Sequence, residues 1–262
     1  FGHKPSLNLL PARGPRLPGP PVAPSMLAVI GPLARSAADL SLAFDVLAGP
    51  DEVDGGAYQL ALRPPRAERL ADARLLVLDE HPSAVTSRDT RDAIDRLATD
   101  LARSGASVAR ASDLLPDLGA AHGAYVKALL TEITRRAPTP GPTISAHEWL
   151  ALLDRRVQLR LQWAALFRSF DAVIAPVFGT TAFPHDDTAT WRDRRLVIDG
   201  AETPYGDQLA WPGVATLPGL PATVVPVGRG SDGLPIGVQI IGPSLEDRTP
   251  LALAAAIEAL RR

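Results

Sequence analysis

Apolar and polar residues recur along the chain with two periods, which predict short strands in alternation with amphipathic helices. Short apolar runs are typical of buried strands, and they occur at residues 74–78, 107–109, 171–177, 222–227 and 236–241. Apolar residues spaced three and four apart predict helices near residues 36–48, 87–104, 147–170 and 247–260. This order of elements favours an α/β fold in which helices cover a sheet.

The boundaries of the first unit carry their own signals. Ser87 is placed to cap the helix at its start, and Gly105 to end it. The flanking strands at 74–78 and 107–109 would then be parallel, joined by a right-handed crossover.

Other residues also mark the ends of predicted elements. Residues 11–24 hold six prolines and predict an extended loop. Ser36, followed by Asp39, predicts a helix start, and Gly49-Pro50 the end of that helix. Asp199-Gly200 predicts a two-residue hairpin turn.

The segment at 147–170 predicts a helix with two opposite apolar faces. One face consists of Leu150, Leu153, Val157, Leu161 and Ala164, and the other of Leu152, Leu159, Trp163, Leu166 and Phe170. Such a helix must be covered twice. We expect the sheet of this chain to cover one face, and a missing segment or a second subunit to cover the other.

Composition excludes several classes of function. The 27 basic and 29 acidic residues give a net charge of −2, which does not favour a nucleic-acid or anionic-membrane surface. No cysteine is present for a thiolate site, and no apolar run approaches the roughly 20 residues of a membrane span. We expect a cytoplasmic protein. Lys4 and Lys127 are the only lysines, so few residues can support lysine-dependent chemistry.

Two local motifs have simpler interpretations than the chemistry they suggest. Residues 228–233 (GRGSDG) match the dinucleotide fingerprint, but strand-like runs lie on both sides, so we interpret them as a polar turn. His185-Asp186-Asp187 offers three metal-ligand types in a row. Consecutive residues of an extended chain point to alternate sides, so we interpret this triplet as a solvated loop and predict no metal site.

The residues alone show no complete catalytic machinery. Serine–lysine catalysis needs a serine whose proton a nearby lysine can accept, but no S-x-x-K occurs. A G-x-S-x-G nucleophile elbow is also absent.

In its ordered motifs the chain resembles the amidase signature hydrolases, and more specifically their stand-alone amidases. The matching segments are 1–6 (FGHKPS), 31–40 (GPLARSAADL), 45–51 (DVLAGPD), 171–177 (DAVIAPV), 205–227, 233–242 (GLPIGVQIIG) and Glu246-Asp247, with 182–186 (AFPHD), 207–211 (DQLAW) and 219–222 (GLPA) favouring the stand-alone type.

The resemblance implies a mixed twisted sheet between helical layers, of which residues 1–262 would form the C-terminal part of a single domain. Members of the family hydrolyse amides through a nucleophilic serine, a bridging serine and a lysine, without metal or cofactor. Those residues lie upstream of the F-G-H-K-P stretch with which this chain opens. We therefore expect no catalytic residue here, and Lys4 is not the catalytic lysine.

The resemblance also implies that this half lines the substrate pocket. The candidate lining residues are Phe178, Tyr205, Asp207 and Trp211. Core packing of Phe178 and Trp211 and helix capping by Asp207 are the alternatives, and Arg35 and Asp39 fit the start of a helix.

Three hypotheses for function follow. The first is part of an amidase that acts on a small-molecule amide, with a missing N-terminal segment or a complementary chain as its partner and a homo-oligomer as a possible assembly. The second is an inactive amidase-like remnant that acts as a scaffold or partner subunit. The third is a nucleotide-binding module built on residues 74–109 and 228–233, which the context of that turn disfavours.

Overall fold

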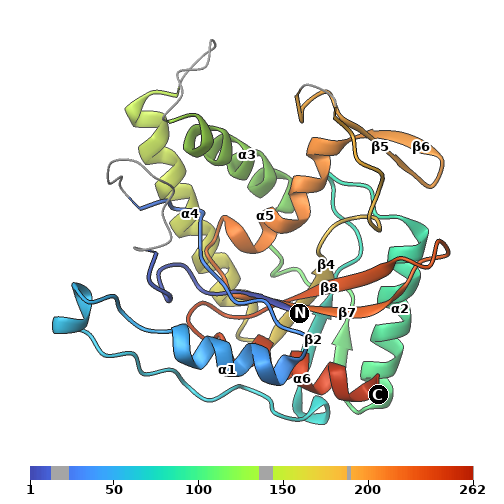
Figure 1. Cartoon of the computed structure of the whole chain (residues 1–262), viewed down its shortest axis with the longest axis horizontal. Coiled ribbons are helices and arrows are strands. Elements are labelled where there is room, and N and C mark those ends of the chain that lie inside the picture. Colours follow the sequence, from blue (N-terminus) through green and yellow to red (C-terminus); the bar gives the residue numbers. More distant parts are fainter. Residues whose placement is uncertain (13–23, 136–143, 188–189, 262) are drawn as a thin grey trace.

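A mixed six-stranded sheet forms the centre of the computed structural model, which describes residues 1–12, 24–135, 144–187 and 190–261 (Figure 1). Its order is β1-β7-β8-β4-β2-β3. The strands are β1 (Gly2–Lys4), β2 (Arg74–Val77), β3 (Ser107–Ala109), β4 (Ala172–Pro176), β7 (Ala222–Arg229) and β8 (Pro235–Ile241). β4, β2 and β3 run parallel, whereas β8, β7 and β1 are joined by antiparallel pairings. The predicted α/β class is thus confirmed.

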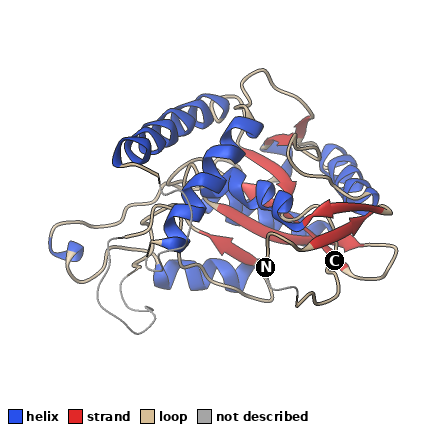
Figure 2. Cartoon of the chain, turned by 90° about the horizontal axis from the view of Figure 1, so that it is seen from above, coloured by secondary structure: helices blue, strands red, loops and turns tan. Residues whose placement is uncertain are grey.

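Helices cover both faces of this sheet (Figure 2). On one face α2 (Arg88–Arg103) and α6 (Arg248–Leu260) share an apolar core with the strands. On the other face lie α3 (Leu118–Thr134), α4 (Ala146–Leu166) and α5 (Ala210–Thr216). α1 (Ala37–Leu47) packs beside α6, and a separate hairpin joins β5 (Arg195–Ile198) to β6 (Ala201–Pro204). Among the described helices, none combines the length and apolarity needed to cross a bilayer.

The boundary signals in the sequence predict several of these elements closely. The Ser87 side chain accepts a hydrogen bond from the amide of Thr90 at the start of α2, and Ser36 accepts one from Asp39 at the start of α1. β2 and β3 are paired in parallel, as expected for the unit at 74–109. Asp199 and Gly200 have φ angles of 51° and 82° and form the turn between β5 and β6.

Some elements differ from the sequence prediction. β1 and α5 were not predicted, and the helical pattern around Lys127 corresponds to α3. α4 ends at Leu166, so Phe170 follows the helix instead of belonging to its face. Most of the proline-rich segment, residues 13–23, lies outside the described residues.

The two apolar faces predicted for α4 have different surroundings. Leu152, Leu159, Trp163 and Leu166 are buried against the sheet and its neighbouring helices. Leu150, Val157 and Leu161 are 57%, 57% and 67% exposed. The described residues therefore cover only one of the two faces.

A buried carboxylate, that of Asp247, connects the two ends of the chain. It accepts hydrogen bonds from the Ser6 amide at 2.7 Å, from Ser6 Oγ at 2.6 Å and from His3 Nε2 at 3.2 Å. The other ring nitrogen of His3 lies 2.9 Å from Thr223 Oγ1 on β7. We call these four residues the Asp247 cluster; it fixes β1 against β7 and the start of α6.

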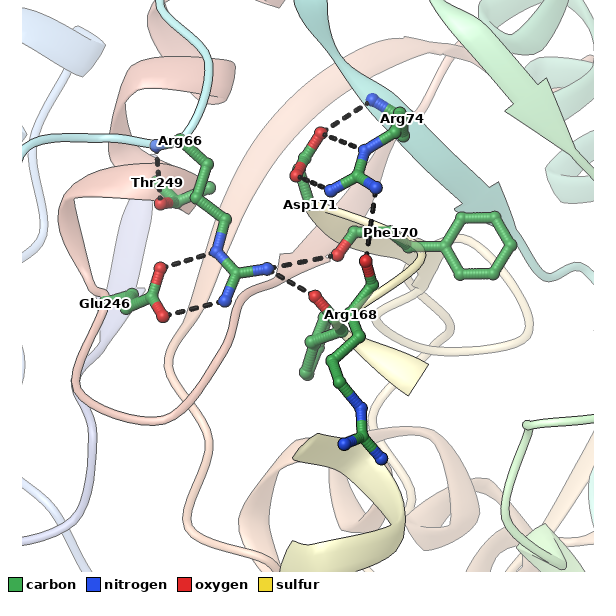
Figure 3. A network of polar contacts seen from close by, with 8 residues as sticks. Arg66, Arg74, Arg168, Phe170, Asp171, Glu246 and Thr249 are labelled. Atoms are coloured by element: carbon green, nitrogen blue, oxygen red, sulfur yellow. Dashed lines mark hydrogen bonds and ion pairs between the residues drawn. The ribbon is translucent and has the colours of Figure 1, made fainter. Parts of the chain in front are cut away.

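Two arginines fix the C-terminal end of α4 (Figure 3). Arg66 binds both carboxylate oxygens of Glu246 and donates to the backbone carbonyls of Phe167 and Phe170. Arg74 binds both oxygens of Asp171 in the same bidentate way and donates to the carbonyl of Arg168. These contacts satisfy carbonyls that a helix end leaves without partners.

At the opposite end of β4, Gln208 joins two loops. Its Oε1 accepts from the Gly179 amide at 2.7 Å, and its Nε2 donates to the Val85 carbonyl at 2.8 Å. The Ser87 amide also donates to the Gly179 carbonyl at 2.6 Å. A Cβ atom at position 179 would lie 2.1 Å from the Val85 carbonyl oxygen, so only glycine fits there.

Replacement of Asp247 by alanine should lower the free energy of unfolding by about 3 kcal/mol, because Ser6 and His3 would lose their shared acceptor in the interior. Urea denaturation measures the change. Asp45→Ala is the matched control, since Asp45 is exposed and pairs with Arg248; it should change stability by less than about 0.5 kcal/mol. Equal effects of the two substitutions would contradict the central role of the Asp247 cluster.

Substitution Gly179→Ala should lower the free energy of unfolding by about 2 kcal/mol, because the added methyl group would push Gln208 and Val85 apart. Gly123→Ala on α3 is its control, since nothing lies within 4 Å of a Cβ atom there. That change should stabilise the protein by about 0.5 kcal/mol. Thermal or urea unfolding of both variants compares them, and a neutral Gly179→Ala would refute the close packing at this junction.

Candidate active-site cleft

Three aromatic side chains meet where the loop after β4 approaches the end of β6. The Phe178 ring centroid lies 5.8 Å from that of Phe183 and 6.1 Å from that of Tyr205, and Phe183 and Tyr205 are 6.0 Å apart. Phe178 and Tyr205 were predicted as lining residues, and the structure brings them together. Phe183 was not singled out from the sequence, although it lies within the AFPHD segment.

A cleft of about 570 Å³ opens beside this aromatic cluster. One wall is the loop at 183–186, and the other is the β5–β6 hairpin with Tyr205. The lining residues are Phe183, Pro184, His185, Asp186, Arg194, Arg195, Leu196, Val197 and Tyr205. Its volume is within the usual range of a small-molecule site, and its lining combines aromatic and charged groups.

The other two predicted lining residues lie elsewhere. Asp207 is half-buried in the short 3₁₀ turn Tyr205–Leu209, next to the cleft in sequence. It does not cap α5, whose N-cap is Leu209 without a side-chain hydrogen bond. Trp211 is fully buried in the core on the α3–α5 face of the sheet, which corresponds to its core-packing alternative.

A pair of histidines packs near this end of the molecule. The His81 ring lies 6.0 Å from that of His122 and 5.3 Å from that of Trp211. Burial, and secondarily the His122 charge, lowers the pKa of His81 to about 4. His81 Nδ1 accepts a hydrogen bond from the Ser83 amide at 3.0 Å, so the neutral ring carries its proton on Nε2.

Two opposing effects act on the pKa of His122. Burial lowers its pKa, and the carboxylate of Asp207 opposes that shift. Two buried atoms, His122 Nδ1 and Trp211 Nε1, have no hydrogen-bond partner in the part of the chain that the structure describes. Sequence reasoning missed both histidines, because isolated histidines carry no spacing signal.

Neither lysine is placed as a catalytic base. Lys4 Nζ donates to the carbonyls of Pro5 and Leu220, at 3.0 and 2.6 Å, and burial lowers its pKa to about 8. Lys127 is exposed and pairs with Glu148 at 2.8 Å.

The two local motifs also have ordinary structural contexts. Residues 228–233 comprise the end of β7, at Gly228-Arg229, and most of its connection to antiparallel β8, where the Gly230 amide donates to the Leu234 carbonyl and the Asp89 carboxylate accepts from Ser231. The polar-turn interpretation is confirmed. Across residues 1–12, 24–135, 144–187 and 190–261, no three His, Asp or Glu side chains are grouped closely enough to hold a metal ion.

Comparison with known sequences gives a consistent result. The family model described as Amidase matches residues 1–136 and 124–251. A fatty acid amide hydrolase of Arabidopsis thaliana is 27% identical over 263 residues, which cover 88% of this chain and 42% of the relative. An indoleacetamide hydrolase of Bradyrhizobium japonicum is 26% identical, over 97% of this chain and 57% of the relative. The chain thus spans about half the length of these relatives.

Solved structures show the same architecture. A bacterial aryl acylamidase of the amidase signature family superposes with a TM-score of 0.72 at 21% identity, over 98% of this chain and 57% of that one. A protein from a vestigial complex, described as revealing the origins of an s-triazine catabolic enzyme, has a TM-score of 0.71 at 25% identity over the same shares. With the sequence match over nearly its whole length, the chain belongs to the amidase family, whose signature enzymes share its fold.

Proposed function

We propose that this chain is the C-terminal part of an amidase that hydrolyses carboxylic amides to an acid and ammonia or an amine. The observation that carries the proposal is the family match over most of the chain, joined to an aromatic cleft of small-molecule size. The serine nucleophile and the lysine of its relay would come from a complementary segment, since Lys4 and Lys127 are each bound to other groups.

The proposed chemistry is acyl transfer through serine. The serine Oγ attacks the amide carbonyl carbon, and its proton passes to a serine–lysine relay. The C–N bond then breaks, and the amine leaves with a proton from that relay. Water attacks the acyl ester, which releases the acid and restores the serine. Backbone amides would stabilise the oxyanion of each tetrahedral intermediate.

In this proposal the described residues bind and orient the substrate. Phe178, Phe183 and Tyr205 supply an aromatic wall for the body of the amide. Asp207, two residues after Tyr205, places an acceptor next to that wall, and its charge acts on His122. Trp211 supports them from the core and does not touch the substrate.

The exposed face of α4 is the proposed docking surface for the complementary segment. Leu150, Leu153, Val157, Leu161 and Ala164 follow one another at intervals of three, four, four and three, which is the spacing of a helix-packing seam. Arg160 flanks that seam and donates to Ser244 Oγ at 3.2 Å, whereas Arg156 is turned toward the residues after α5, where its Nε donates to the Leu217 carbonyl at 2.8 Å. Arg156 Nη2 is buried without a hydrogen-bond partner among the described residues, and its pKa is lowered by burial and by Arg160.

Charge favours an acidic amphipathic helix as the occupant over a second copy of α4. An antiparallel copy centred on Val157 would place the arginine edge of one helix against the same edge of the other. Like charges in that position are repulsive. A helix with glutamate or aspartate at its edge would instead pair with Arg160, which is exposed.

An inactive, amidase-like partner subunit is the second candidate function. The observation that favours it is the likeness to a protein of a vestigial complex, at 25% identity. In that case the same α4 face would bind the partner, but no preparation containing this chain would hydrolyse amides.

The test of the proposed function compares the 262-residue chain alone with the chain joined to the polypeptide encoded directly before Phe1. Only the joined form should release ammonia from benzamide. In that form, Tyr205→Ala should lower kcat/KM by about tenfold, because one aromatic wall of the cleft is lost. Tyr58→Ala, at an exposed tyrosine, is the control and should leave kcat/KM unchanged. Absence of turnover in both forms would favour the inactive subunit.

Association with that polypeptide, supplied as a separate chain, tests the docking surface. Leu161→Lys should weaken binding and raise the dissociation constant by at least about tenfold, since a charge would enter an apolar contact. Gln162→Lys adds the same charge to the same helix away from the seam and should have little effect. Analytical ultracentrifugation measures both, and equal binding by the two variants would exclude the α4 face as the docking site.

A further inference from the structure

Three arginines, Arg192, Arg194 and Arg195, lie close together in sequence at the start of β5, and Arg194 differs from the other two. The Arg192 guanidinium lies 5.2 Å over the Trp191 ring. Arg195 donates to the carbonyls of Arg192 and Arg194, and its Nε is 3.7 Å from Glu202. Arg194 lines the cleft, and its buried Nε finds no hydrogen-bond partner among the residues described.

The position of Arg194 is set by the hairpin. It stands directly before β5, and its carbonyl accepts a hydrogen bond from the Tyr205 amide at 3.1 Å, directly after β6. The two cleft residues are therefore held opposite each other by the backbone. Tyr205 contributes the aromatic wall, and Arg194 contributes a fixed positive charge beside it.

A buried guanidinium donor that forms no hydrogen bond destabilises the folded protein. Such a donor loses its hydration and gains nothing in return, unless an acceptor enters with a ligand. The guanidinium presents donors in a planar fork that fits a carboxylate with two parallel hydrogen bonds. Asp186 is the one carboxylate among the residues that line the cleft, and it has an interaction of its own.

We infer that the amide bound in this cleft carries an anionic group, most simply a carboxylate, and that Arg194 binds that group. The inference rests on the proposed function and names its substrate class: an amide with an aromatic or apolar body and a negative charge at the end away from the reacting carbonyl. The aromatic cluster would bind the body, and Arg194 would select for the charge. Arg194 is then a specificity-determining residue.

Titration calorimetry of the 262-residue chain with two probes of the same shape tests the inference. The probes are benzamide, which is neutral, and 4-carbamoylbenzoate, which carries one carboxylate. The chain should bind 4-carbamoylbenzoate at least about tenfold more tightly, the usual gain from a charge-assisted hydrogen bond. The variant Arg194→Met should bind both probes with the affinity of benzamide.

Arg192→Met is the matched control, because it removes a neighbouring positive charge that does not line the cleft. It should keep the preference for 4-carbamoylbenzoate. Equal affinities of the unaltered chain for the two probes, or a preference that survives Arg194→Met, would overturn the inference. So would the absence of binding by either probe. Release of ammonia from benzamide by the joined form would still support the proposed function in each of those cases, so the two failures are distinguishable.

Discussion

The buried carboxylate of Asp247 is the interaction on which the arrangement of this chain depends. β1 is only three residues long and contributes little sheet pairing by itself. It is retained because Ser6 and His3 deliver three hydrogen bonds to one carboxylate at the start of α6. That carboxylate is fully buried, and an acceptor without donors in the interior would cost several kcal/mol, on the order of a lost buried ion pair. The cluster therefore joins residues more than 240 positions apart and closes one edge of the sheet.

The two ends of β4 then have different tasks. At its start, Arg74 and Arg66 hold the end of α4 through bidentate carboxylate pairs and backbone carbonyls, which makes that end rigid. At its other end the chain leaves the sheet at Pro176 and forms loops, with Gln208 as their polar junction. Binding residues are often carried by loops that a rigid scaffold positions, and the aromatic cluster lies just beyond this junction.

The sequence predicts the parts of the fold whose signals are local. Ser87 and the apolar runs around it establish β2, α2 and β3, because a cap and a single apolar face determine a surface helix. The helical pattern around Lys127 corresponds to α3, but its bounds were not predicted, since Gly119 and Gly123 weaken that pattern. α5 was not predicted, since Pro212 interrupts its pattern. Packing against Trp211 and Tyr125 stabilises both. For the cleft, Tyr205 lies in its wall and Phe178 packs beside Tyr205, but the burial of Trp211 and the proximity of His81 to His122 depend on long-range contacts that no spacing encodes.

The distribution of unpaired polar atoms shows where this surface is chemically incomplete. The described residues contain five buried side-chain atoms without a partner: Thr86 Oγ1, His122 Nδ1, Arg156 Nη2, Arg194 Nε and Trp211 Nε1. Folded proteins rarely leave such atoms unsatisfied. Trp211 is fully buried in the core, and Arg156 already donates through its Nε to the Leu217 carbonyl, so these two atoms lie inside the packing of the chain. Thr86 adjoins the Gln208 junction, Arg194 lines the cleft, and His122 is near Asp207. Of these, Arg194 is the one that borders an open cleft, where a ligand can supply the missing acceptor.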